Sequence, residues 1–262
     1  MRRRTSAVLL AVLAATPLLA EPSLPAELEG VGIIEQIGQS VDPGLSFTNE
    51  DGHRVELGSY LHKGRPVLLN LVYYTCPMLC NLLLNGQTST LRAIPWTPGE
   101  QFEIVTISID PTETPQLAGQ KKRTYLASYG RPAPGWHFLV DRDGNAKKLA
   151  ERVGFHYRYD ERQQQYAHAA AIMILTPEGK VSRYLYGAQF KARDLRLALT
   201  EASAGRTGGV VDRLLLFCFH YDPQARSYVL FATNFMRAGG VAVVLVLGGV
   251  LMGLWRKERA SA

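Results

Sequence analysis

The spacing of apolar and polar residues predicts strands that alternate with helices. Val67 to Tyr74 is a continuous apolar run, typical of a strand buried on both faces. Apolar residues recur at helical spacing after Cys80, and Pro77 suits the first helical position. Phe102 to Ile109 predicts a second buried strand, and a helix from Thr114 to about Tyr129 follows, with Thr114 as its cap. This alternation favours a mixed α/β sheet with parallel central strands and flanking helices.

Shorter patterns complete this domain. They predict a hairpin over 45–57 that turns at Asp51-Gly52, a strand over 136–140, a helix over 146–153 that Asp143 caps, strands over 169–175 and 181–186, and a helix over 191–204. Phe155 to Gln165 is polar and aromatic without a clean period, so no element is assigned to it.

Both ends of the chain have the pattern of membrane-directed segments. Residues 1–20 combine three arginines, an apolar core and a cleavage position after Ala20, which indicates a signal peptide; an uncleaved anchor is the alternative. Phe235 to Trp255 predicts a C-terminal transmembrane helix, and the basic cluster after it indicates a cytoplasmic end; a buried core helix is the alternative. We therefore expect an exported domain that is tethered to the membrane.

The net charge of +6 does not indicate nucleic-acid binding. Arg2, Arg3 and Arg4, with a net two charges from residues 256–259, account for all but one of these charges. The predicted organisation is a signal peptide (1–20), a leader (21–43), a globular domain (44–204), a linker (205–234), the membrane helix (235–255) and a cytoplasmic tail (256–262).

Two of the three cysteines, Cys76 and Cys80, lie where the first buried strand gives way to a helix. A helix N-terminus stabilises thiolates, the reactive and metal-binding form of cysteine. The Cys-x-x-x-Cys spacing places both on one helical turn, where they can form a redox-active disulfide or bind a soft metal such as Cu(I) or zinc. A structural disulfide or two buried thiols is the alternative, and an oxidising compartment permits a disulfide.

His168 is the histidine that topology would bring to these cysteines. It directly precedes the predicted strand 169–175, and cysteines at a strand-to-helix junction of a mixed sheet are typical of the thioredoxin arrangement, in which this loop faces the cysteine pair. His53 and His62 look like surface residues, His137 like a packed strand residue, and His156 lies in the aromatic stretch. Two thiolates and an imidazole suit Cu(I) and can also bind Cu(II). A packed or exposed histidine is the alternative.

Three motifs resemble the SCO/SenC family, the membrane-tethered, thioredoxin-like copper proteins of cytochrome c oxidase assembly. They are YYTCPMLC over 73–80, SIDP over 108–111 followed by Thr114-Pro115, and His168 ahead of the PEGK turn over 177–180. The resemblance covers roughly residues 35–203. It implies copper binding through Cys76, Cys80 and His168, with Asp110 as a supporting partner or a turn residue.

The resemblance also implies a function. Such a protein delivers copper to the dinuclear copper centre of cytochrome c oxidase subunit II, or keeps the cysteines of that centre reduced. The expected location is the bacterial inner membrane, with the domain in the periplasm. A metallochaperone is favoured over an enzyme; a thiol–disulfide oxidoreductase that uses Cys76 and Cys80 is the alternative, and a peroxidase is a third hypothesis.

The chain departs from the family in three places. Ala167 stands where many members have an aspartate before the histidine, and the predicted membrane span is C-terminal rather than N-terminal. Cys218 and His220 lie beyond the usual domain; they could form an auxiliary copper site, or Cys218 could be buried in an apolar linker.

Overall fold

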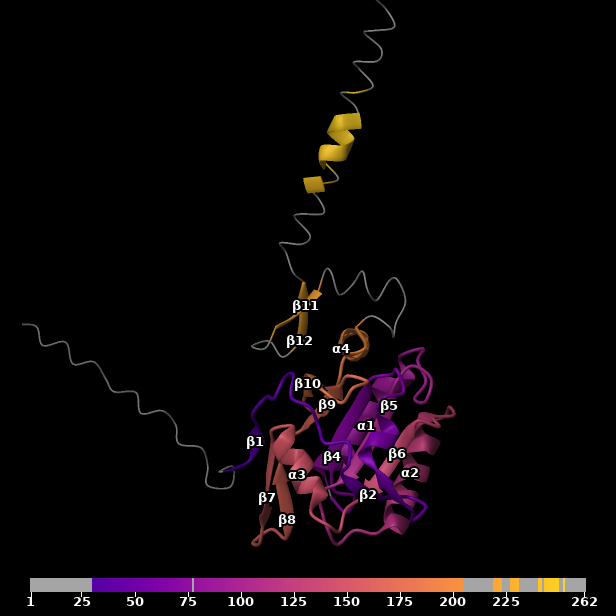
Figure 1. The fold of residues 1–262 in the computed structure, drawn as a ribbon, viewed down its shortest axis with the longest axis vertical. Coiled ribbons are helices and arrows are strands. Elements are labelled where there is room, and N and C mark those ends of the chain that lie inside the picture. The colour runs from indigo at the N-terminus through magenta and orange to yellow at the C-terminus, as the bar shows by residue number, and fades with distance from the viewer. Residues whose placement is uncertain are drawn as a thin grey trace, which may run out of the picture.

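A seven-stranded mixed sheet forms the centre of the protein in this computed structural model, which describes residues 30–76, 78–204, 219–222, 227–230, 240–241, 243–249 and 252 (Figure 1). The strand order is β10-β9-β4-β5-β6-β2-β3. The strands are β2 (Ser46–Asn49), β3 (Arg54–Glu56), β4 (Val67–Val72), β5 (Glu103–Ser108), β6 (Trp136–Val140), β9 (Ala171–Leu175) and β10 (Val181–Tyr186). β4, β5 and β6 are parallel, while the outer strands pair antiparallel. The buried runs predicted from the sequence are therefore the central strands.

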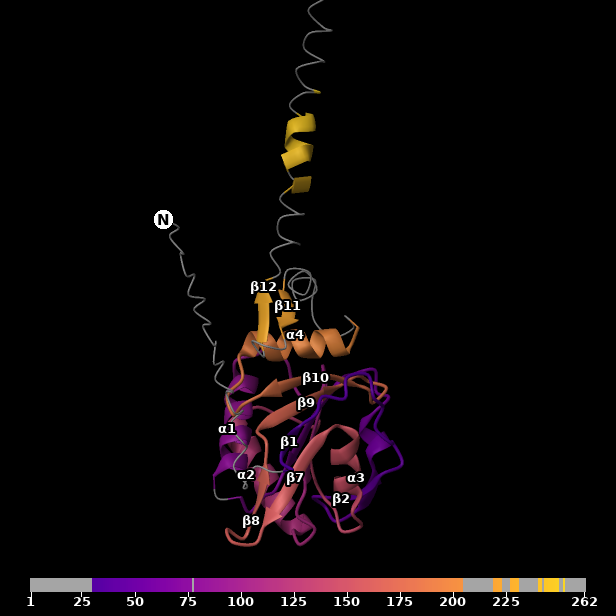
Figure 2. The same ribbon diagram turned by 90° about the vertical axis from the view of Figure 1, so that its left-hand side faces the viewer.

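Helices cover both sides of this sheet. They are α1 (Leu79–Arg92), α2 (Pro115–Tyr129), α3 (Asn145–Arg152) and α4 (Ala192–Ala202), with the 3₁₀ turn η2 (Leu57–Tyr60). Figure 2 shows α1 and α2 on one side of the strands and α3 on the other, with α4 beside β10. The hydroxyl oxygen of Thr114 accepts a hydrogen bond from the amide of Leu117 at 3.3 Å, as expected of the cap of α2.

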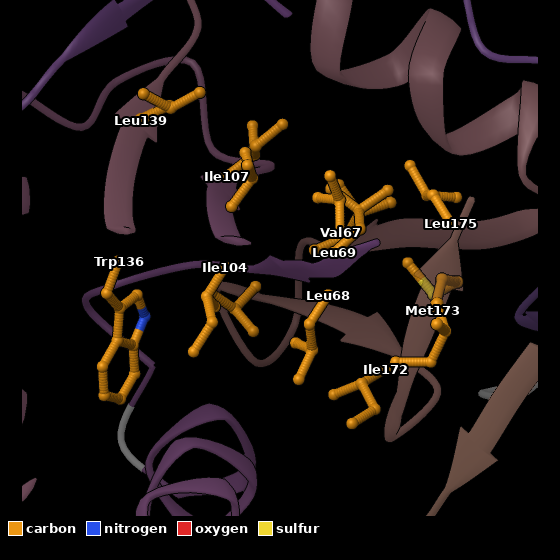
Figure 3. Close-up of a cluster of buried hydrophobic side chains, with 14 of the residues drawn as sticks. Val67, Leu68, Leu69, Ile104, Ile107, Trp136, Leu139, Ile172, Met173 and Leu175 are labelled. Carbon is orange, nitrogen blue, oxygen red and sulfur yellow. The ribbon is translucent and has the colours of Figure 1, made fainter. Parts of the chain in front are cut away.

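The core lies on both faces of β4 and β5, whose residues are all buried. Leu68, Ile104 and Trp136 point to one side in Figure 3, and Val67 and Ile107 point to the other. This alternation follows from the two-residue period of a strand. Since each fully buried large apolar side chain contributes about 1.5–3 kcal/mol, the central strands are held firmly and provide a rigid base for the loops at their ends.

A second, three-stranded antiparallel sheet lies where no element was predicted. It consists of β1 (Gly32–Ile33), β7 (Phe155–Asp160) and β8 (Gln165–His168), in the order β1-β7-β8. Its strands carry tyrosines, which have an apolar ring and a polar tip and therefore do not produce a clear alternation of apolar and polar residues. β8 ends at His168, so this sheet supports a predicted site residue.

Two predicted helix starts were wrong. α1 begins at Leu79 rather than at Pro77, because Met78 has a non-helical backbone conformation and is the N-cap. Asp143 does not cap α3: Gly144 is the N-cap, with φ 76°, and Asp141 accepts the hydrogen bond from the amide of Ala146 at 2.7 Å. The left-handed glycine turns the chain so that the earlier aspartate reaches the helix.

The C-terminal part of the described chain contains a hairpin of β11 (Phe219–Asp222) and β12 (Ser227–Leu230). Helical backbone is described at 240–241, 243–249 and 252. Within the residues that the structure describes, no helix is long and apolar enough to cross a membrane. The predicted signal peptide, most of the predicted membrane segment and Cys218 lie outside the described residues.

Candidate metal centre

The two cysteines lie at the end of the central strand, next to the start of α1. Cys76 follows a turn in which its amide donates to the carbonyl oxygen of Tyr73 at 3.3 Å, and Cys80 lies in the first turn of α1. The amide of Cys80 donates to the sulfur of Cys76 at 3.3 Å. Both side chains are buried, and neither is in a disulfide. The predicted placement of the cysteines on one side of a helical turn therefore brings the second residue against the sulfur of the first.

The structure brings His168 to this pair from the second sheet. Its Nε2 atom lies 3.1 Å from the sulfur of Cys80, although the two residues are 88 positions apart. Its Nδ1 atom lies 2.9 Å from the carbonyl oxygen of Ala169. Because a carbonyl oxygen can only accept, Nδ1 carries the ring proton and Nε2 presents its lone pair to Cys80. The imidazole is thus held in the tautomer that a metal ion requires.

The two cysteines differ in ionisation because they share one proton. The hydrogen bond from the side chain of Cys80 lowers the pKa of Cys76 to about 3, with further contributions from the backbone amides of Cys80 and Met78. The same hydrogen bond to Cys76, together with burial, raises the pKa of Cys80. The proton therefore stays on Cys80, which donates it to the Cys76 thiolate.

A buried carboxylate that the sequence did not reveal fixes the turn before Cys76. Glu113 is 3% exposed, and its two oxygens accept four hydrogen bonds. Oε2 accepts from the amide of Tyr74 at 2.8 Å and from the hydroxyl of Ser108 at 2.6 Å. Oε1 accepts from the amide and the hydroxyl of Thr75 at 2.6 and 2.9 Å. Glu113 thereby joins the end of β5 to the turn that carries Cys76.

Asn81 holds the carbonyl side of the same turn. Its side-chain amide donates to the carbonyl oxygen of Cys76 at 2.9 Å. Its own oxygen accepts from the Lys121 ammonium at 3.3 Å and from the Tyr125 hydroxyl at 3.2 Å. Both of these donors lie on α2, so α2 positions the Cys76 backbone through Asn81.

Aromatic rings enclose His168. Its ring centroid lies 5.8 Å from that of Phe155 and 6.0 Å from that of Tyr73, and Tyr166 packs edge-on against Tyr73 at 5.5 Å. Only 7% of the His168 surface is exposed. The rings therefore keep water from the imidazole and from the cysteine pair, which favours soft-ligand chemistry.

The remaining predicted site residues lie elsewhere. The carboxylate of Asp110 accepts from the amide and the hydroxyl of Thr112 at 2.8 and 2.7 Å, which is the geometry of a turn residue. His220 lies on β11, where only the backbone is described. His137 lies on β6 within 3.2 Å of Glu103, near the start of β5 and away from the cysteines.

The group formed by Cys76, Cys80 and His168 is hydrogen-bonded rather than assembled around a common point. In the described chain, no three His, Cys, Asp or Glu side chains already have the arrangement of a metal site. The sulfur of Cys80 keeps a proton, which it donates to the Cys76 thiolate. A metal ion would have to displace that proton before it could bind to both sulfurs.

Comparison with protein families decides the relationship. The family model described as SCO1/SenC matches residues 35–202, which include the whole seven-stranded sheet, β7 and β8 of the small sheet, and every residue of the cysteine–histidine group. The chain belongs to the SCO1/SenC family. No curated protein sequence matches the chain significantly.

Two similar solved structures show the fold of the chain. A candidate electron transfer protein of Aquifex aeolicus VF5 superposes with a TM-score of 0.57 at 21% identity, and the alignment covers 65% of this chain and 96% of that one. BsSco, described as a member of the Sco family of cytochrome c oxidase assembly proteins, gives a TM-score of 0.51 at 22% identity, with 65% and 97% coverage. ScoI of Bradyrhizobium japonicum, solved with copper bound, gives 0.45 at 22% identity, with 64% and 96% coverage. The first two superpositions confirm the predicted mixed α/β, thioredoxin-like fold.

Proposed function

We propose that this protein binds copper through Cys76, Cys80 and His168 and carries it to a copper protein during cytochrome c oxidase assembly. The observation that carries the proposal is the position of the His168 Nε2 lone pair, 3.1 Å from the sulfur of Cys80 and beside the Cys76 thiolate. Membership of the SCO1/SenC family supports the biological setting.

The donor set suits copper as cargo. Two sulfurs and one imidazole nitrogen are soft ligands that favour Cu(I), and the set can also bind Cu(II). Cys76 is already a thiolate, while Cys80 has to lose its proton when the metal binds. Release of the metal would return a proton to Cys80, so loading and unloading each involve one proton at this sulfur.

The proposal includes a recipient and a location. The recipient is the dinuclear copper centre of oxidase subunit II, and the domain faces the periplasm from a membrane tether at Phe235 to Trp255. The support for the tether is the uncharged stretch of residues 238–255 and the basic cluster that follows it. Reporter fusions that are active only in the periplasm, placed after Ala204 and after Ala262, test this topology: the first is expected to be active and the second inactive.

Titration of the full chain in detergent micelles with Cu(I), against a competing chelator, tests the ligand set. Replacing Cys76, Cys80 or His168 with alanine is expected to weaken binding by more than about tenfold, since even outer-shell changes cost 10–100-fold. His156→Ala is the matched control, because His156 lies in the same small sheet but outside the cysteine group. If the His168 variant binds copper as tightly as the His156 variant, the three-ligand site is wrong.

A thiol–disulfide oxidoreductase is the second candidate, and one observation favours it. The Cys76 thiolate has a lowered pKa and lies beside the Cys80 thiol, which is the arrangement of an attacking and a resolving cysteine. Reduction of an oxidised peptide that carries the two subunit II cysteines distinguishes the two functions. An oxidoreductase needs both cysteines but retains activity in His168→Ala, whereas copper transfer requires all three residues.

A further inference from the structure

The outer face of α1 is exposed and carries no charge. Met78, Leu82, Asn85 and Ser89 form a line along it at helical spacing, here called the α1 ridge. Met78 is 68% exposed and Leu82 is 51% exposed, and the first charged residue of the helix is its last, Arg92. The solvent-facing side of a surface helix is normally polar and charged. Exposed methionine and leucine without nearby charges are typical of the centre of a protein interface.

The ridge is bordered by a groove on each side. The first groove, of about 840 Å³, lies between α1 and the segment that leads into α4, with Leu82 on one wall and Ala188 and Phe190 on the other. The backbone of Ala188 comes so close to α1 that a side chain at Gly86 would lie 1.8 Å from its carbonyl oxygen. The second groove, of about 410 Å³, lies between α1 and α2. Side chains of a partner could therefore enter a groove on each side of the ridge.

The border of this surface is basic. α1 and α2 contain no acidic residue, while α2 contains Lys121 and Arg123, together with Lys122, which pairs with Glu50. Lys121 lines the second groove, and Lys191 is exposed next to Phe190 at the first. Arg92 is exposed at the far end of the ridge. A neutral centre inside a basic border is complementary to a protein surface whose apolar centre has an acidic border.

We propose that the α1 ridge and its two grooves are the docking surface for the protein that exchanges copper with this centre, a folded domain with an acidic border around its own metal site. This inference rests on the proposed function. Direct transfer requires both metal sites to lie inside one interface, and Met78 lies between Cys76 and Cys80. A partner seated on the ridge therefore lies directly over the turn that carries both cysteines. Two of the four ridge residues are polar, and a groove lies on each side of the ridge. Such a relief is complementary to the uneven surface of a protein rather than to a flat lipid surface.

Copper transfer from the full chain in detergent micelles to the purified soluble domain of oxidase subunit II tests the surface. Leu82→Gln removes the apolar centre, and Lys191→Glu reverses a border charge at the N-terminus of α4, where an acid is favourable for the helix. Each is expected to slow second-order transfer roughly three- to tenfold and to weaken binding of the copper-free chain to the same domain to a similar extent. The Lys191 effect should shrink at high salt.

Matched controls lie away from the ridge. Ile37→Gln changes another exposed apolar residue (46% exposed), and Lys147→Glu reverses an exposed charge in the first turn of α3, on the other side of the sheet. All four variants should keep the wild-type Cu(I) affinity and unfolding temperature, and the controls should keep the wild-type transfer rate.

The outcomes separate the two proposals. Normal copper binding with equal transfer rates in ridge and control variants would overturn the docking surface and leave copper binding standing. A wild-type chain that holds no copper overturns the proposed function, while the binding measurements on the copper-free chain still judge the surface. Ridge variants that change only self-association in sedimentation, or only binding to anionic phosphatidylglycerol vesicles, would assign the face to a second copy or to lipid and refute the acidic partner.

Discussion

Replacing Glu113 with glutamine tests whether the buried carboxylate positions the cysteine turn. A glutamine side chain has one oxygen and one NH₂ group in place of two oxygens. Whichever way it points, the NH₂ group faces a backbone amide, that of Tyr74 or that of Thr75, and neither can turn away. The hydroxyls of Thr75 and Ser108 can rotate and become acceptors.

The magnitude follows from these contacts. One buried backbone donor without a partner costs about 1–3 kcal/mol, and the remaining hydrogen bonds lose the strength that a charged acceptor gives them. The free energy of unfolding should fall by roughly 2–4 kcal/mol, which corresponds to a drop in Tm of about 4–16 °C for a domain of this size. Because the turn before Cys76 loses its anchor, we expect Cu(I) affinity to fall roughly tenfold.

Urea unfolding and chelator-competition titration of the full chain measure the two effects. Glu103→Gln is the matched control: Glu103 is also buried, but it lies at the start of β5 and pairs with Arg65, Lys63 and His137. This variant should lose stability without losing copper affinity. If Glu113→Gln weakens copper binding no more than Glu103→Gln does, Glu113 has only a structural role and the reasoning is refuted.

Two further predictions concern pH and packing. Since the pKa of Cys76 falls from 9.0 to about 3 on folding, the unfolded copper-free chain binds one more proton between these values; stability should therefore rise with pH across this window. Urea unfolding should show a larger rise in the wild type than in Cys76→Ser, and a constant difference between the two contradicts the assignment. Gly86→Ala places a methyl group 1.8 Å from the Ala188 carbonyl oxygen and should cost about 1–3 kcal/mol. Ser89→Ala, exposed on the same helix, should leave the Tm nearly unchanged; equal melting of both variants would show that Ala188 moves away freely.

The sequence predicted the central elements because each has a strong local signal. The buried runs became β4 and β5, and a strand was assigned to Trp136–Val140 with its observed bounds. The position of His168 followed from topology, since the residue ahead of an antiparallel strand beside β4 lies near the end of β4. Local pattern and sheet order were sufficient for these features.

Glu113 escaped prediction because its partners are distant in sequence. The amides of Tyr74 and Thr75 are 39 and 38 positions away. In the sequence, a glutamate just before a helix cap is typical of an exposed residue that interacts with the helix N-terminus. Asp110 attracted the prediction because it follows the strand directly, yet its oxygens are taken by Thr112. The path of the turn between β5 and α2 decides whether Asp110 or Glu113 faces inward. The spacing of apolar residues does not predict that path.

The two cysteines follow β4 of the large sheet, whereas His168 ends β8 of the small one. A copper ion held by Cys80 and His168 would be a removable cross-link that closes a loop of 88 positions, worth on the order of 4 kcal/mol in chain entropy. The free energy of unfolding would then be higher with copper bound and would fall when copper is released. By reciprocity, anything that tightens the small sheet against the large one would make the protein bind copper more tightly.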